Sequence, residues 1–171
     1  MLDEVPSRPR ARIGAMPERF EVQRAIAATP DEIFAVLADP QGHVAIDSSG
    51  MLMAASGDPV AKVGDTFTVH MDREALNDYP ELGLYDVIIE ITALEPGREI
   101  AWTVKGNFNL NHVYGYRLEP ADAGTLVTAY YDWSEVDEKM KGIFPVIPES
   151  ALRATLGILA RTVAPGKPRP A

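Results

Sequence analysis

Hydrophobic positions alternate along several segments of the chain, with the spacing of two that is typical of β-strands. In residues 20–26, Phe20, Val22 and Ile26 fall on one side at a spacing of two. Similar alternation occurs in five further segments, 64–71, 85–94, 99–104, 111–119 and 125–134. A turn sequence at 120–124 joins the last two segments as a hairpin. Short connections between consecutive strands favour an antiparallel sheet.

Between the first two strand segments, the spacing changes to that of a short helix. Thr29 is a good N-cap, Pro30 suits the first helical position, and Glu32 completes a capping box. The helix should end before Pro40, because the residue that precedes a proline avoids helical backbone angles. We expect a second short helix over 40–46.

One longer helix is predicted near the C-terminal end of the chain. Its apolar stripe is Leu152, Leu156, Leu159 and Val163, at spacings of three and four residues. The sheet has an apolar face that must be covered, and this helix is the longest element available to cover it. The sequence therefore predicts an α+β helix-grip fold, with six to seven antiparallel strands curved around a long C-terminal helix and two short helices after the first strand.

Composition narrows the class of protein. The chain has 171 residues, of which 46 % are apolar and 24 % charged, as in ordinary soluble domains. No apolar run reaches the ~18 residues of a transmembrane helix. The first residues lack the apolar core of a secretory signal, so we expect a cytoplasmic protein. The absence of cysteine excludes disulfides, thiolate nucleophiles and cysteine metal sites.

The net charge of −9 is unevenly distributed. Basic residues gather near the two ends, at Arg8, Arg10, Arg12, Lys167 and Arg169. The middle of the chain is therefore more acidic than the whole and should repel phosphate backbones, which argues against a nucleic-acid partner. We expect residues 1–18 to form a disordered arm, 19–164 a single domain, and 165–171 a flexible tail.

Three features occur in a fixed order: the run FEVQRAIAATPDEIFAVLADPQGH at 20–43, the motif LEP-x3-GT-x-VT at 118–128, and the closing amphipathic helix. Together they resemble the START/polyketide cyclase (SRPBCC, Bet v 1-like) superfamily. The pieces IDSSG at 46–50, IAW at 100–102 and DWS at 132–134 resemble its uncharacterised bacterial polyketide cyclase/dehydrase-like branch. The resemblance covers about 19–164. It implies a mainly apolar cavity between the sheet and the C-terminal helix, and it carries over no catalytic residue set.

Alternation places many rings and aliphatic side chains on one face of the predicted sheet. Rings with polar tips suit a pocket that packs a flat or oily ligand and places a few hydrogen bonds. The alternative is an ordinary core whose tyrosine hydroxyls reach water. The predicted ligand-binding residues are Phe67, Val69, Tyr85, Ile89, Trp102, Tyr114, Tyr116, Tyr131, Trp133, Leu152 and Leu156.

His43 and Asp47 are four residues apart and could face each other on a short helix. A carboxylate that orients an imidazole would make a general base. We favour the alternative, a surface helix in which Asp47 bonds its own backbone near 48–50. The remaining candidates for proton transfer are His112 and Tyr85.

Other site chemistry has little support in the sequence. The three histidines, at 43, 70 and 112, lack the organised spacing of a zinc site, so we expect no metal and no other cofactor. Serine-hydrolase, P-loop and Rossmann motifs are absent. Asp72, Glu74, Asp78 and Glu81 suggest a solvated loop that could serve as a lid over a pocket.

Three functions remain open from the sequence. The first is binding of a small hydrophobic or aromatic molecule, lipid-like or polyketide-like, in the predicted cavity. The second is a cyclase or dehydratase that acts in the same cavity mostly by positioning its substrate. The third is a protein-interaction module or homodimer without a ligand, which a collapsed cavity and an exposed apolar patch would favour.

Overall fold

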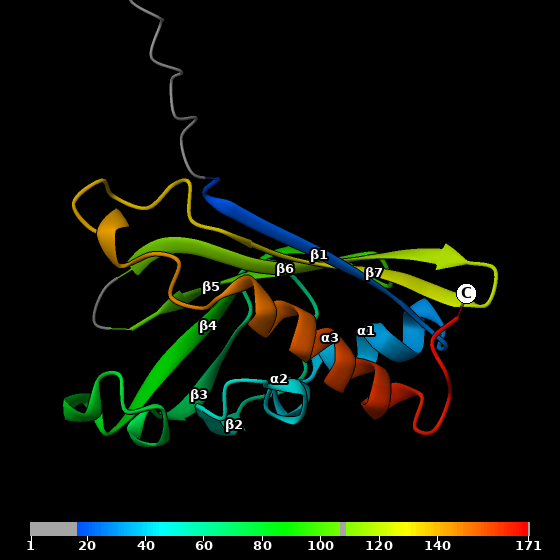
Figure 1. Cartoon of the computed structure of the whole chain (residues 1–171), viewed down its shortest axis with the longest axis horizontal. Helices are drawn as coiled ribbons and strands as arrows, with labels where there is room; N and C mark the ends of the chain where they lie inside the picture. The colour runs from blue at the N-terminus through cyan, green and yellow to red at the C-terminus, as the bar shows by residue number, and fades with distance from the viewer. Residues whose placement is uncertain (1–16, 107–108, 171) are drawn as a thin grey trace, which may run out of the picture.

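The computed structural model describes residues 17–106 and 109–170. Its centre is one curved antiparallel sheet with the strand order β1-β7-β6-β5-β4-β3-β2 (Figure 1). The strands are β1 (Arg19–Ile26), β2 (Leu52–Ser56), β3 (Thr66–Asp72), β4 (Leu84–Glu95), β5 (Glu99–Lys105), β6 (Asn109–Ala121) and β7 (Gly124–Asp132). Most of the predicted N-terminal arm lies outside the described residues. Glu18, from the end of that arm, binds Lys141 Nζ at 2.9 Å.

All three α-helices lie on the same side of the sheet (Figure 1). They are α1 (Pro30–Ala38), α2 (Pro40–Ile46) and α3 (Glu149–Val163). Three single 3₁₀ turns lie in the connections, η1 (Glu74–Leu76), η2 (Pro80–Leu82) and η3 (Lys141–Ile143). The sheet and the C-terminal helix thus confirm the helix-grip fold. Among the helices of the described residues, none is both long and apolar enough to cross a membrane.

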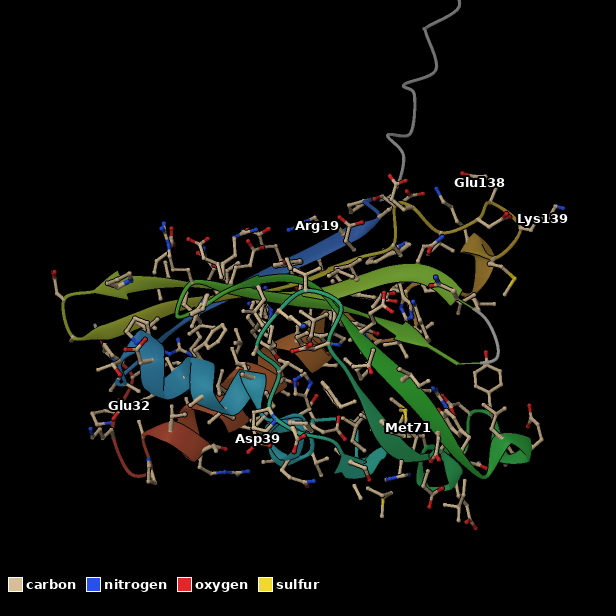
Figure 2. The ribbon with its side chains drawn as sticks, turned by 180° about the vertical axis from the view of Figure 1, so that it is seen from behind. Arg19, Glu32, Asp39, Met71, Glu138 and Lys139 are labelled. Atoms are coloured by element: carbon tan, nitrogen blue, oxygen red, sulfur yellow. The ribbon has the colours of Figure 1, made fainter. Side chains whose placement is uncertain are left out.

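The start of α1 has the predicted capping box. The Thr29 hydroxyl accepts a hydrogen bond from the Glu32 backbone N–H at 3.2 Å, and the Glu32 carboxylate accepts one from the Thr29 N–H at 2.8 Å. Figure 2 labels Glu32 at this end of the helix and Asp39 at the junction with α2. The Asp39 carboxylate caps α2 by accepting from the Gln41 N–H at 3.0 Å.

Replacement of Thr29 by alanine is expected to lower the free energy of unfolding by about 1 kcal/mol, because it removes the acceptor for one N–H of the first helical turn. Chemical denaturation of both proteins measures this difference. Thr29→Ser keeps the hydroxyl and is expected to retain most of the stability. Equal losses in the two variants would contradict a capping role.

The sequence did not predict strand β2. Its five residues, LMAAS, lack alternating apolar and polar positions, and a register shift between Leu52 and Ala54 interrupts its pairing with β3. The strand is defined by its backbone pairing with β3 at the edge of the sheet, which no local pattern reports. It brings the number of strands in the described residues to seven.

The helices cover different parts of the sheet, and this determines where a cavity can exist. α3 packs on β1 and β7, and its stripe residues Leu152, Leu156 and Leu159 are buried. α2 contacts β2 and β3 instead. Over β3 to β6, residues of α2 and of the first half of α3 border a space on the inner face.

Candidate ligand-binding cavity

A cavity of about 330 Å³ lies between the inner face of β3–β6, the end of α2 and the first half of α3. This volume is at the lower end of the range that small-molecule sites occupy. Seven of the predicted ligand-binding residues line it, namely Val69, Tyr85, Ile89, Trp102, Tyr114, Tyr116 and Leu152. His43, Asp47 and His112 line it as well.

The strand alternation explains why these side chains share one wall. In the antiparallel register, Val69 pairs with Val87 and Met71 pairs with Tyr85, so the four side chains point to the same face. Met71 is labelled on β3 in Figure 2 and belongs to this wall. The next residues along each strand point to the opposite face, where Ile88 is exposed.

A ladder of stacked rings crosses the inner face from β5 to β7. Trp102 stacks on Tyr114 with ring centroids 6.1 Å apart, and Tyr114 stacks on Tyr131 at 4.2 Å with the rings 8° from parallel. Trp133 continues from Tyr131 at 5.1 Å and meets Phe20 edge-on at 4.8 Å. Trp102 and Tyr114 are exposed to the cavity, so the ladder presents flat apolar faces to it.

The other four predicted ligand-binding residues do not line the cavity. Tyr131, Trp133 and Leu156 belong to the region where α3 rests directly on β7 and β1, so they are packed in the core. Phe67 packs edge-on against the His43 ring, with centroids 4.9 Å apart. Strand alternation predicted the inward direction of Phe67, Tyr131 and Trp133, and helical spacing predicted that of Leu156. The position of the helices decides which inward residues contact the cavity.

His43 is a buried cavity residue, and α2 is not the surface helix that we favoured. Gly42 allows the close approach of α2 to α1, because a Cβ at this position would lie 1.8 Å from the Val36 carbonyl oxygen. The His43 Nε2–H then donates to the Leu37 carbonyl oxygen at 2.8 Å. Burial lowers the pKa of His43 to about 4, so the imidazole is neutral at pH 7.

His43 and Asp47 are not hydrogen-bonded to each other, in agreement with the interpretation of Asp47 that we favoured. The Asp47 carboxylate instead accepts hydrogen bonds from the Ser49 N–H at 3.0 Å, the Ser49 hydroxyl at 2.7 Å and the Leu52 N–H at 3.2 Å. These bonds fix the loop between α2 and β2, as the alternative interpretation of Asp47 predicted. The His43 imidazole instead contacts the Leu37 carbonyl oxygen of α1 and the rings of Phe67 and Trp102.

His112 is the second buried imidazole of the cavity wall. Its Nδ1 lies 2.9 Å from the Tyr131 hydroxyl, and its ring packs edge-on against Tyr114 and Phe144. Burial lowers the pKa of His112 to about 4 and raises the pKa of Tyr131 to about 12. Burial also raises the pKa of Tyr114 well above its usual value. All three groups are therefore neutral at pH 7.

Two polar elements flank the apolar wall. Arg73 follows β3 and ion-pairs with Asp78, which lies between η1 and η2, and this pairing raises the pKa of Arg73 above its usual range. At the helix side, the Thr155 hydroxyl donates to Ser48 Oγ at 3.0 Å, and the Ser48 hydroxyl donates to the Ala151 carbonyl oxygen at 3.0 Å. These bonds tie α3 to the loop after α2.

Sequence reasoning missed several lining residues. Two of them could have been predicted from strand alternation. Val87 lies two residues after Tyr85, and Arg73 continues the series Phe67, Val69 and Met71. Ser48 and Ser49, in the loop after α2, had no such signal. Val146 and Ile147 lie between two prolines, where no periodicity exists to indicate which side chain points inward.

This arrangement can hold a compact apolar or flat molecule. Stacked rings and aliphatic side chains would contact its surface, while hydroxyls and one guanidinium at the edges could satisfy a few polar atoms. The two imidazoles are neutral and can each offer or accept a proton in a hydrogen bond, but their low pKa makes them weak bases at pH 7.

Comparison with known proteins places this geometry in a family. Residues 17–164 match the family model described as polyketide cyclase/dehydrase and lipid transport. No curated protein matches the chain.

Solved structures share the architecture at low sequence identity. A crystal structure from Chromobacterium violaceum has 16 % identity and a TM-score of 0.61, covering 87 % of this chain and 99 % of that one. The Aha1 dimer from Colwellia psychrerythraea has 19 % identity and a TM-score of 0.57, covering 88 % and 98 %. An AHSA1-like protein from Aeromonas hydrophila has 15 % identity and a TM-score of 0.56, covering 85 % and 91 %. At these identities the likeness shows the fold alone.

Proposed function

This chain belongs to the polyketide cyclase/dehydrase and lipid transport family, and from that premise we propose that it binds a small hydrophobic or aromatic molecule, lipid-like or polyketide-like, in the cavity between the sheet and α3. The observation that carries the proposal is the wall itself. Trp102, Tyr114 and Tyr116 present rings to a space of about 330 Å³. Apolar groups that line a space of this size gain van der Waals contacts with a ligand that fills it.

The affinity would come mainly from burial of the ligand's apolar surface. Each Å² removed from water contributes ~25 cal/mol before the costs of association are subtracted. Tyr116 lines the cavity, and its burial, together with a smaller effect of the nearby Asp47 charge, raises the pKa of Tyr116 above its usual range. Tyr116 therefore stays protonated and can donate a hydrogen bond to a carbonyl or hydroxyl of the ligand.

Titration with N-phenyl-1-naphthylamine, a neutral and flat fluorescent probe, is expected to show saturable binding to the wild-type protein. Ala151 lines the cavity from α3, so Ala151→Trp should fill the space and weaken binding at least ~10-fold, equivalent to 1.4 kcal/mol. Arg153→Trp is the matched control, because Arg153 is on the same helix, exposed, and outside the cavity wall. Unchanged binding by Ala151→Trp, or equal weakening by both variants, would contradict the proposal.

A second candidate function, catalysis in the same cavity, is favoured by one observation. His112 is a buried imidazole in the wall, and it is hydrogen-bonded to the Tyr131 hydroxyl. We propose that a cyclase or dehydratase reaction here would use His112 to transfer a proton while the wall folds a flexible chain. Mass spectrometry of a poly-β-ketone thioester incubated with the protein would detect loss of water. Retention of that loss in His112→Asn would exclude His112 from the proton transfer.

An interaction module without a ligand is less well supported. That hypothesis predicted a cavity collapsed by large side chains, whereas the described residues leave about 330 Å³ open. Exposed apolar side chains do occur on the outer face, where Leu84 is 80 % exposed. A module that only binds other proteins, however, would have no need of the cavity.

A further inference from the structure

The outer face of the sheet, opposite the cavity, carries a serine, a histidine and an aspartate in one hydrogen-bonded chain. Ser56 Oγ lies 2.8 Å from His70 Nε2, and His70 Nδ1 lies 2.7 Å from Asp86 Oδ1. We propose that these three residues form a nucleophilic site that hydrolyses small carboxylic esters. Ser56 would be the nucleophile, His70 the general base and Asp86 the residue that orients His70.

The hydrogen bonds determine the tautomer of His70. The Asp86 carboxylate only accepts hydrogen bonds, so the proton on the neutral ring must be on Nδ1, which donates to Oδ1. Nε2 then carries the lone pair and accepts from the Ser56 hydroxyl. This is the orientation in which an imidazole can remove the serine proton as the oxygen attacks.

The strand register explains how residues so distant in sequence meet. On the outer face, Ala54, His70 and Asp86 lie opposite one another on β2, β3 and β4. Ser56, two residues after Ala54 on β2, points to the same face and is diagonal to His70. The inner-face neighbours Val69 and Val87 line the cavity, so the triad and the cavity occupy opposite faces of the sheet.

The three side chains are accessible to a substrate. Ser56 is exposed, and the side chains of His70 and Asp86 are 41 % and 62 % exposed. An exposed hydrogen-bonded pair adds at most about 1 kcal/mol to stability, so the arrangement has little structural role to explain it. Ser56 also ends β2, which is an edge strand of the sheet formed by the described residues, so its outward backbone N–H groups face no other strand of that sheet. Such N–H groups are the kind of donor that stabilises an oxyanion.

The pairing of β2, β3 and β4 also places an apolar side chain beside the three residues, which favours an ester with an apolar acyl group. Thr68 lies opposite Ser56, and Ile88 lies opposite Thr68, so the three form a row beside the Ala54–His70–Asp86 row. Ile88 is 47 % exposed and offers an apolar contact on the same face as the nucleophile. A small ester with a short apolar acyl group fits a site whose Ser56, His70 and Asp86 side chains are exposed, with Ile88 as the apolar contact.

The reaction balances with water as the only co-reactant. Ser56 Oγ attacks the ester carbonyl carbon while its proton passes to His70 Nε2. The bond to the leaving oxygen breaks, and the alcohol departs with that proton, leaving an acyl-Ser56 ester. Water then attacks this ester and gives its proton to Nε2. Release of the carboxylic acid returns the proton to Ser56 Oγ.

Hydrolysis of 4-nitrophenyl acetate by the full chain tests the proposal. The wild-type rate is expected to exceed that of Ser56→Ala at least ~10-fold, a modest share of what positioned acid–base catalysis provides. Ser134→Ala is the matched control, because its hydroxyl is also exposed and bonds an aspartate, Asp132 Oδ1 at 2.6 Å, with no imidazole in that bond. Its rate should equal the wild-type rate. A biotinylated fluorophosphonate should label Ser56, as identified by tandem mass spectrometry.

The role of Asp86 has a separate readout. Asp86→Asn should slow both hydrolysis and labelling, and Asp86→Glu should restore part of each, because it restores the carboxylate. Circular dichroism and thermal unfolding confirm that each variant is folded. Equal hydrolysis by the wild type and Ser56→Ala, or labelling at another residue, would overturn the proposal.

Discussion

Lowering the pH from 7 to 5 is expected to reduce the free energy of unfolding by about 4 kcal/mol, roughly 2 kcal/mol for each buried histidine. Burial lowers the pKa of both His43 and His112 from the ordinary 6.5 to about 4. Between these values the unfolded chain binds protons that the folded protein does not. The stabilisation is therefore complete above pH 6.5 and is lost as the pH falls toward 4.

Urea denaturation at a series of pH values between 7.5 and 5 measures this dependence. Keeping the pH above 5 leaves the carboxylates ionised in both states, so the histidines dominate the slope. His43→Gln retains a donor for the Leu37 carbonyl oxygen, and His112→Asn retains a partner for the Tyr131 hydroxyl. Each variant should remove about half of the slope, and a flat profile in the wild type would show that neither imidazole is buried.

Truncation of Leu156 to alanine is expected to lower the free energy of unfolding by about 3 kcal/mol, because it opens a void in a close-packed region. Leu156 is 1 % exposed and lies in the core, although the sequence predicted it as a ligand contact. Because it lies outside the cavity wall, the affinity for N-phenyl-1-naphthylamine should not change. Urea denaturation and probe titration on the same variant measure the two effects.

Leu152 provides the matched comparison, one helical turn earlier on α3. It is also buried, but it borders the cavity, so its side chain already lacks neighbours on one side. Leu152→Ala should cost less stability than Leu156→Ala and should change the probe affinity. The reverse pattern, with affinity sensitive to Leu156 and indifferent to Leu152, would place the binding site elsewhere on the helix.

The local signals in the sequence predicted most of the fold. The capping box at Thr29, the proline at 40 and the strand periods act over a few residues, so they can be recognised without knowing the tertiary structure. β2 depends on pairing with a strand that comes later in the chain. Its sequence therefore carries no pattern from which its position could be predicted.

The cavity was less predictable than the fold, for a physical reason. Strand alternation predicts that Tyr114 and Tyr131 point inward, and both do, but only Tyr114 lines the cavity. The difference depends on where α3 rests, which is a property of helix packing. The contribution of Ser48 and Ser49 depends in the same way on how Asp47 fixes its loop.

The outer-face triad illustrates the same limit more sharply. Ser56, His70 and Asp86 are spread over three strands and belong to no local motif. The absence of a nucleophile-elbow motif argued against serine chemistry in the sequence. Geometry brings the three groups together in a way that spacing along the chain could not indicate.

The most direct test of ligand binding in the cavity is a methyl NMR titration with N-phenyl-1-naphthylamine. Val87 and Ile88 are neighbours on β4, yet Val87 lines the cavity and Ile88 is exposed on the outer face. A flat probe inside the cavity should shift the methyl signals of Val87, Ile89 and Leu152 saturably through its ring current, and leave Ile88 and Leu84 unchanged. Shifts confined to Ile88 and Leu84, or no saturable shift at all, would contradict ligand binding in the cavity.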